Sequence, residues 1–179
     1  MRLIIMCCLC FTLSSCDLIS SPNQHTSRSM QCSFKVPEGF KIAQEEKNNV
    51  TLIRDDEKLH IIVVHHIGKN PITDENINAT GGSFVTSNLG IDNIYDIDKV
   101  VKLYGNRKVS GRKAAWFYYP DEKLGVLVYR VFIGGKGNSL YEIAFMIAPQ
   151  ENYNEALDEA DKTIDSFLDG FKIHLLSWF

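Results

Sequence analysis

Three apolar stretches in the second half of the chain constrain its fold more than any other feature. Ala114 to Tyr119, Val126 to Ile133 and Leu140 to Ile147 are rich in β-branched and aromatic residues, which favour β-strands. The connections between them contain Pro120 and Gly134-Gly135-Lys136-Gly137-Asn138, and connections this short join antiparallel neighbours. Both faces of the three strands are largely apolar, so we expect another layer to cover each face.

The residues after Pro149 supply one candidate for such a layer. Between Glu151 and Asp169 the apolar residues recur at spacings of three and four, which predicts an amphipathic helix. The apolar stripe of this helix comprises Tyr153, Leu157, Ala160, Ile164, Phe167 and Leu168. A second helix is predicted within residues 73–89, frayed or broken at Gly81-Gly82 because glycine is a poor helix former. The sequence therefore predicts an α+β fold, with an antiparallel sheet, helices on both faces and a long final amphipathic helix.

The first residues of the chain have the form of a secretory signal. Arg2 precedes an apolar run from Leu3 to Leu13, which is shorter than the roughly 20 residues that a membrane-spanning helix needs. The run ends in Leu13-Ser14-Ser15-Cys16, which resembles the lipobox of bacterial lipoproteins. The resemblance implies cleavage before Cys16, lipid on its sulfur and an acyl chain on its new amine. The alternative is an ordinary cleaved signal followed by an incidental cysteine.

The segment after the signal is predicted to connect a membrane anchor to a domain. Residues 16–31 are polar and rich in serine, which predicts a lipidated N-terminus followed by a flexible tether. Asp17 resembles the signal that retains lipoproteins on the inner membrane of enteric bacteria. The predicted organisation is a signal peptide over 1–15, this lipidated tether over 16–31, and a single α+β domain over 32–179. We expect the protein in the bacterial cell envelope, lipid-anchored and facing the periplasm, with the inner membrane favoured.

The charge balance argues against a nucleic-acid partner, and the cysteines of the mature chain leave no pair for an intramolecular disulfide. The chain carries 19 basic and 22 acidic residues, a net charge of −3, and loses Arg2 with the signal. This balance gives no electrostatic footprint for nucleic acid, and it predicts no basic patch for anionic lipid. Three of the five cysteines leave with the signal and Cys16 becomes a thioether. Cys32 is therefore predicted to stay unpaired, as a small half-buried residue at the edge of the first strand.

The opening of the domain and the order of its elements resemble a known family. Phe34-x-Val36-Pro37-x-Gly39-Phe40 is followed by the three-strand region, a proline and a helix that ends near Ser166-Phe167. This arrangement resembles the PsbP/DcrB-like superfamily over nearly the whole mature chain. The resemblance implies an antiparallel sheet with helices on both faces and a role in protein binding, because most members are not enzymes and share no catalytic residue. The lipobox argues against the cytosolic chaperones of type VI secretion effectors within that superfamily.

No group of residues predicts catalysis, a metal or a cofactor. His65 and His66 are adjacent in an expected strand and so point to opposite faces. His60 shares a face with His66 but lies about 20 Å away at ~3.3 Å per residue. The acidic residues between 92 and 98 lack the glycine and the final glutamate of an EF-hand loop.

Two charged residues lie within the three-strand region. A hairpin centred near Lys136 would place Arg130 and Glu142 directly opposite each other, as a cross-strand ion pair. The glycine-rich run around Lys136 separates two strands, so it predicts a hairpin turn and not a phosphate-binding loop.

The aromatic run from Trp116 to Tyr119 suggests where a partner could bind. Two of its residues are expected in the core, and Trp116 and Tyr118 are the candidates for a surface that a protein partner contacts. Phe179, at the end of an apolar tail, is a third candidate. For the tail as a whole, packing on the domain is favoured, and addition as an edge strand or contact with a membrane or partner are the alternatives.

The predicted function is that of a non-enzymatic, membrane-anchored periplasmic lipoprotein that binds a protein partner in the cell envelope. One alternative is an immunity lipoprotein that neutralises a secreted antibacterial toxin of the type VI kind. A second alternative is the binding of a small molecule or lipid between the sheet and a helix.

Overall fold

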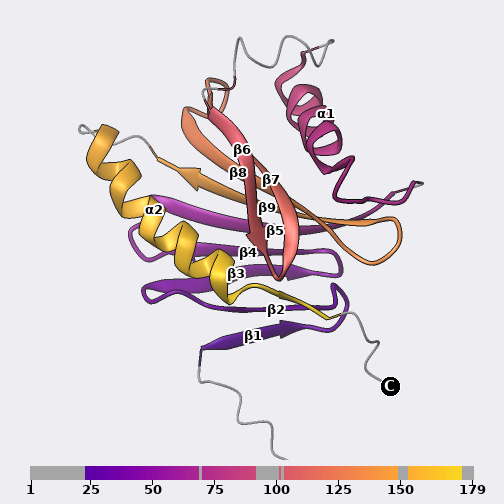
Figure 1. Ribbon diagram of the computed structural model, residues 1–179. Coiled ribbons are helices and arrows are strands. Elements are labelled where there is room, and N and C mark those ends of the chain that lie inside the picture. Colours follow the sequence, from indigo (N-terminus) through magenta and orange to yellow (C-terminus); the bar gives the residue numbers. More distant parts are fainter. Residues whose placement is uncertain (1–22, 69, 92–100, 102, 149–152, 175–179) are drawn as a thin grey trace, which may run out of the picture.

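The computed structural model describes residues 23–68, 70–91, 101, 103–148 and 153–174. Within these residues the chain forms two helices and two antiparallel sheets (Figure 1). In chain order the elements are β1 (Gln24–Ser27), β2 (Cys32–Lys35), β3 (Phe40–Glu46), β4 (Asn49–Arg54), β5 (Leu59–Ile67), α1 (Ile77–Leu89), β6 (Leu103–Val109), β7 (Arg112–Asp121), β8 (Val126–Gly134), β9 (Ser139–Ile147), α2 (Tyr153–Gly170) and β10 (Lys172–Ile173). The prediction of an α+β fold built on an antiparallel sheet is therefore confirmed.

The larger sheet contains seven strands in the order β3-β4-β5-β9-β8-β7-β6, and every neighbouring pair is antiparallel. The three predicted strands are β7, β8 and β9, which form a meander. Pro120 lies at the end of β7 and not in the following turn. Proline is tolerated there because the pairing between β6 and β7 has already ended at Tyr118.

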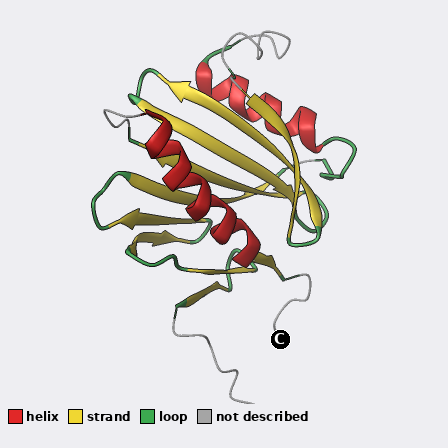
Figure 2. Ribbon diagram, turned by 60° about the vertical axis from the view of Figure 1, so that its left-hand side comes forward, coloured by secondary structure: helices red, strands yellow, loops and turns green. Residues whose placement is uncertain are grey.

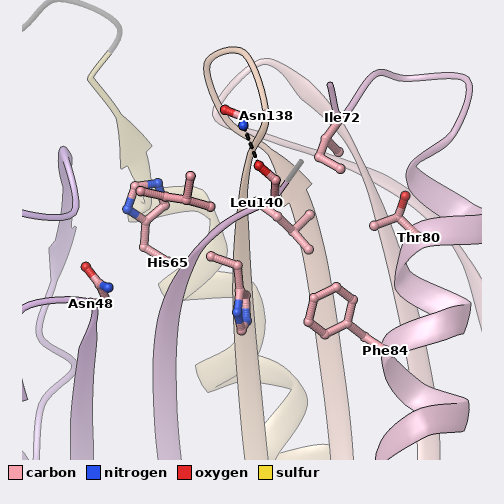
Figure 3. A pocket seen from close by; sticks show the side chains of 10 residues that line it. Asn48, His65, Ile72, Thr80, Phe84, Asn138 and Leu140 are labelled. Atoms are coloured by element: carbon pink, nitrogen blue, oxygen red, sulfur yellow. Dashed lines mark hydrogen bonds between the residues drawn. The ribbon is translucent and has the colours of Figure 1, made fainter. Parts of the chain in front are cut away.

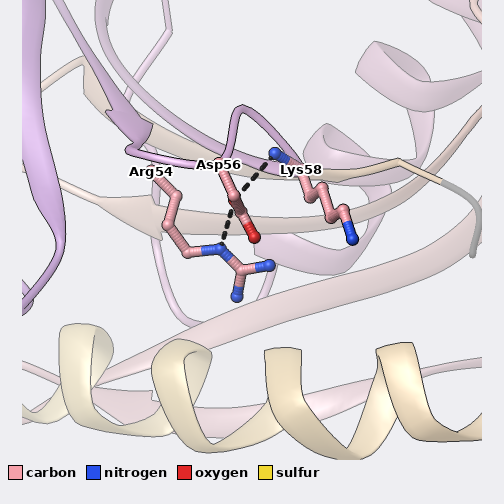
Figure 4. Close-up of polar contacts among 3 residues, drawn as sticks. All are labelled: Arg54, Asp56 and Lys58. Atoms are coloured by element: carbon pink, nitrogen blue, oxygen red, sulfur yellow. Dashed lines mark hydrogen bonds and ion pairs between the residues drawn. The ribbon is translucent and has the colours of Figure 1, made fainter.

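The turn between β4 and β5 is held by one carboxylate (Figure 4). Asp56 Oδ1 accepts hydrogen bonds from Arg54 Nε at 2.7 Å and from the backbone N–H of Lys58 at 3.0 Å. The bond from Arg54 is the main reason why the pKa of Asp56 lies below its usual value. The carboxylate of Asp56 therefore stabilises this turn.

The smaller sheet, in the order β1-β2-β10, corrects the predicted domain boundary. Residues 16–31 are predicted as a tether, but all four residues of β1 pair with β2, and Met30 is fully buried. The backbone N–H of Val36 also donates to the carbonyl of Asn23, the first described residue. The tether prediction is therefore wrong from Asn23 onward. Its polar composition was misleading because β1 buries only Ser27.

Two hydrophobic clusters use alternate residues of the same strands. On β7, Ala114 belongs to the cluster that includes α2, whereas Ala115 and Phe117 belong to the cluster that includes α1. Successive residues of a strand point to opposite sides, so the two clusters lie on opposite sides of β7. In Figure 2, α2 lies across the front of the sheet. The predicted stripe of α2 contributes Ala160, Ile164, Phe167 and Leu168 to its cluster.

The helix α1 runs without a break through Gly81-Gly82, where the sequence predicts fraying or a break. A Cβ on Gly81 would lie 2.7 Å from Cδ2 of Phe132 and 2.8 Å from Cε2 of Phe117, closer than side chains pack. Glycine at this position therefore lets the helix backbone approach two aromatic rings. The contact with the sheet compensates for the weak helix propensity of glycine.

Cys32 is fully buried, and not half-buried at a strand edge as predicted. Burial, with a smaller contribution from Glu45, raises the pKa of its thiol from 9.0 to about 12. The thiolate is the nucleophile, so we expect the folded protein to resist iodoacetamide at pH 8 while the urea-unfolded chain reacts. Folding stability should also fall as the pH rises from 9 to 12, because the unfolded thiol then ionises before the folded one. Equal alkylation rates in the folded and unfolded chains would contradict this prediction.

Candidate functional site

A pocket of about 420 Å³ lies around the end of β5 and extends to α1. Its walls combine polar and apolar residues: Asn48, His65, His66, Ile67, Gly68, Ile72, Thr80, Phe84, Asn138 and Leu140. Figure 3 shows Asn48 and His65 on one side, and Thr80 and Phe84 of α1 on the other. The side-chain amide of Asn138 donates to the carbonyl of Gly68, which ties the β8–β9 hairpin to the end of β5. We call this site the rim pocket. Its volume suits a small molecule.

The two adjacent histidines of the rim pocket lie in different surroundings, as their positions in a strand predict. His65 stacks on Tyr141 at 4.6 Å between ring centroids, and its Nε2 is buried with no hydrogen-bond partner among the described residues. The pKa of His65 lies below its usual value, mainly because the ring is buried and to a smaller extent because of the charge of His66. His65 is therefore a neutral ring with one unused polar atom. His66 packs near Phe84 of α1 and lies in hydrogen-bond contact with Glu142 at 2.8 Å.

Glu142 connects the rim pocket to a buried cation. Its Oε2 contacts His66 Nε2, and its Oε1 lies 3.0 Å from Nε of Arg130. The side chain of Arg130 is only 15% exposed, and its Nη1 has no hydrogen-bond partner among the described residues. The guanidinium lies 5.9 Å from the ring centroid of Tyr119, within cation–π range. Desolvation by burial is the main cause that raises the pKa of Tyr119 to about 12, so its ring stays neutral.

The ion pair between Arg130 and Glu142 is confirmed, but its predicted register is wrong. Glu142 lies opposite Phe132, and Arg130 lies opposite Ala144, so the two charges are diagonal neighbours. The hairpin is centred at Gly137, one residue beyond the predicted centre, where the positive φ of 63° suits glycine. Long side chains span such a diagonal.

A second candidate site lies at the open edge of the larger sheet. β6 is the last strand, and within the described part of the chain no strand pairs with its outer side. Leu103 and Tyr104 of β6 are 61% and 58% exposed. Trp116 and Tyr118 of β7 are half-buried and share a face of the sheet with Leu103, and Trp116 stacks on Tyr129 at 5.5 Å. Tyr104 lies on the other face, where it stacks on Phe117. We call this edge of the sheet, with the side chains of Leu103, Tyr104, Trp116 and Tyr118 on its two faces, the β6 edge.

Trp116 and Tyr118 were predicted from the sequence as candidate site residues, whereas Leu103 and Tyr104 were not. Gly105 lies within β6, and the turn between β6 and β7 lies at Ser110 and Gly111, which have φ values of 53° and 75°. A Cβ on Gly105 would lie 2.9 Å from the indole of Trp116. The glycine therefore makes room for the indole ring on β6.

The remaining predicted site residues lie outside the described ranges. These are Cys16, Asp17, Phe179 and the acidic residues between 92 and 98. Among the residues that are described, no group of three or more histidines, cysteines or carboxylates is arranged to hold a metal ion. None of the described helices combines the length and apolarity needed to cross a membrane.

The sequence matches no protein-family model and no curated protein, but the fold matches solved structures. The solution structure of cyanobacterial PsbP (CyanoP) from Synechocystis sp. PCC 6803 is 12% identical, and the match covers 90% of this chain and 98% of that one at a TM-score of 0.59. Two crystal structures are more distant. One is from Bacteroides thetaiotaomicron VPI-5482, with 10% identity, 84% and 48% coverage and a TM-score of 0.48. The other is PA94, a putative regulator from Pseudomonas aeruginosa, with 10% identity, 75% and 88% coverage and a TM-score of 0.35. The chain therefore has a PsbP-like fold, as its order of elements predicted.

Proposed function

We propose that this protein is a non-enzymatic lipoprotein, anchored in the inner membrane through lipid on Cys16 and facing the periplasm, that binds a protein partner in the cell envelope. The lipobox and Asp17 support the anchor. The PsbP-like fold is compatible with a DcrB-like domain in which α1 and α2 each cover one face of the sheet. The proposal assigns no catalytic residue.

The β6 edge is the observation that carries the protein-binding role. An edge strand presents unpaired backbone N–H and C=O groups to a strand of another chain. Leu103 and Tyr104 add exposed apolar area at that edge. The opposite edge strand, β3, is interrupted by a bulge between Ile42 and Gln44 and ends in two glutamates, features that discourage strand addition.

The charges of the β6 edge favour an acidic partner segment. Lys108 of β6 and Lys113 of β7 lie directly opposite each other, and Lys108 is exposed. Like charges in this arrangement destabilise a sheet. A carboxylate on an added strand would relieve this repulsion, so we propose that the partner contributes an extended segment with both acidic and apolar side chains.

A pair of exposed leucines tests this docking site. A photo-crosslinking amino acid in place of Leu103, 61% exposed, should yield a protein adduct in living cells, because this side chain lies on the binding edge. The same replacement at Leu124, 60% exposed in the turn between β7 and β8, serves as the matched control and should yield none. Adding Lys108→Glu should reduce the adduct at position 103 severalfold. Equal adducts at both positions, or none at either, would contradict the docking site.

The immunity lipoprotein is a narrower version of the same proposal, in which the partner is a secreted antibacterial toxin. Cells that lack the protein should then be killed by toxin-producing sibling cells, while complemented cells survive. Survival of the deletion strain at the parental level would rule out immunity and leave the broader protein-binding role in place.

The rim pocket favours a second candidate function, the binding of a small molecule. Its unused His65 Nε2 and the amide of Asn48 could bond polar groups of a ligand, and Ile72 and Phe84 could contact its apolar part. The ligand that this lining suits is small, uncharged and amphipathic. Native mass spectrometry of the purified protein should detect such a ligand, and a His65→Phe variant should lose it. A bare protein mass from cells in which the protein is normally made would contradict this candidate.

A further inference from the structure

The smaller sheet has an outward face that differs in charge from the rest of the protein. Cys32 and Phe34 point into the hydrophobic core, so the alternate residues of β2, Ser33 and Lys35, lie on the opposite face. Ser33 is itself buried, because its hydroxyl contacts the side chains of Gln24 and His174. Residues paired across strands share a face, so Lys172 of β10 and Thr26 of β1 lie beside Ser33, and Gln24 lies beside Lys35.

None of these outward positions is acidic, although the whole chain has a net charge of −3. Lys35 and Lys172 are both exposed, as are Gln24 and Thr26 of β1. Lys172 Nζ also contacts the carbonyl of Asp169 at the end of α2, at 3.4 Å. The outward face is therefore a small cationic surface, which composition did not predict because its two lysines lie far apart in the sequence.

The position of this face relative to the proposed anchor is restricted. Asn23 is hydrogen-bonded to Val36 and lies seven residues after Cys16. Seven residues span at most about 25 Å at roughly 3.6 Å each, whatever their conformation. Figure 1 shows the smaller sheet at the end of the molecule away from α1. A lipid on Cys16 would therefore hold this end of the protein close to the bilayer.

The last described residues of the chain also belong to the smaller sheet or contact it. After β10, the backbone N–H of His174 donates to the carbonyl of Gln31 in the β1–β2 hairpin. Five residues follow His174 in the sequence, and four of them are apolar: Leu175, Leu176, Trp178 and Phe179. The end of the domain nearest to the anchor is thus also the end from which the apolar tail begins.

We propose that the outward face of the β1-β2-β10 sheet lies against the membrane and that Lys35 and Lys172 bind the headgroups of anionic phospholipids. The proposal extends the anchored lipoprotein proposed above. The lipid holds the protein at the membrane, and the two lysines fix which side of the domain faces it. The rim pocket and the β6 edge belong to the larger sheet and stay free for their ligands.

Vesicle binding by the unlipidated mature chain, residues 17–179, tests the face without the anchor. Each cation near an anionic surface strengthens binding about fivefold. Lys35→Gln with Lys172→Gln should therefore weaken binding to phosphatidylglycerol-containing vesicles by roughly 25-fold. The matched control is Lys58→Gln with Lys123→Gln, which removes two exposed lysines from turns of the larger sheet and should change binding little. Binding should also be lost in 1 M salt, where charges are screened over about 3 Å.

A fluorescent probe on the lipidated protein tests the orientation. A polarity-sensitive dye on Thr26→Cys, on the outward face, should shift to the blue on vesicles, whereas the same dye on Ser87→Cys of α1 should not. Buried Cys32 should not take up the dye.

The two experiments separate this proposal from the anchored lipoprotein. Equal vesicle binding by the two double variants, or a blue shift at position 87 and not at 26, would overturn the membrane-facing sheet even if Cys16 carries lipid. Selective loss of binding in the Lys35 and Lys172 variant would support the face even if Cys16 carries none.

Discussion

Replacing Glu142 with alanine is expected to lower the free energy of unfolding by about 3–5 kcal/mol, because it leaves Arg130 as a buried cation without a counter-charge. The two side chains are only 15% and 10% exposed, so water cannot replace the lost carboxylate. Urea unfolding followed by circular dichroism measures the change. His66 also loses its acceptor, but its side chain is 32% exposed and can bond to solvent.

A double replacement distinguishes the effect of an unpaired buried charge from that of lost packing. Arg130→Met with Glu142→Leu removes both charges and keeps apolar volume, and it should be near neutral or stabilising. The non-additivity of the single and double variants then measures the coupling. An unfolding midpoint for Glu142→Ala equal to that of the parent protein would contradict the buried ion pair.

Replacing Phe167 with alanine is expected to cost about 3–5 kcal/mol, the range for a buried aromatic side chain. Phe167 lies within 5.2 Å of Phe34 in β2 and 5.8 Å of Phe145 in β9, measured between ring centroids. It therefore joins α2 to both sheets. Hydrogen exchange should show the amides of β1 and β2 losing protection first, because the smaller sheet depends on this contact.

Ser166→Ala provides the matched control for Phe167→Ala. Ser166 is the preceding residue of α2 and is exposed, so its replacement should change the free energy of unfolding by less than about 0.5 kcal/mol. If Phe167→Ala unfolds with the same midpoint as this control, or if the smaller sheet keeps its protection, the proposed role of the aromatic contact is wrong.

The central meander of the larger sheet could be predicted from the sequence because its signals are local. Each strand of the β7-β8-β9 meander is a run of residues that favour strands, and the turns between them are short. The final helix could be predicted because its apolar residues repeat with the helical period. The separation of His65 and His66 follows from the alternation of strand residues alone.

Other features depend on contacts between distant residues and left no local signal. The unbroken course of α1 through Gly81 depends on the rings of Phe117 and Phe132, which lie far along the chain. The position of Gly105 in a strand depends on Trp116. The residues of β1 were predicted as a tether because only one of them is buried. Its pairing with β2 therefore has no alternating hydrophobic pattern from which a strand could be predicted.

Only part of each candidate site could be predicted from local sequence. Trp116 and Tyr118 could be named from the sequence as an aromatic run, whereas Leu103 and Tyr104 became candidates only once β6 was placed at the edge of the sheet. The rim pocket combines residues from β5, α1 and the β8–β9 hairpin, which no single stretch of sequence brings together.

The intact mass of the mature protein, extracted from bacterial membranes, is the most direct test of the lipid anchor. We expect a chain that begins at Cys16, lacks residues 1–15, and carries lipid on its sulfur and an acyl group on its amine. A Cys16→Ser variant should lose the lipid and leave the membrane fraction. A mature chain that begins at another residue, or that carries Cys16 with a free thiol, would contradict the membrane-anchored lipoprotein.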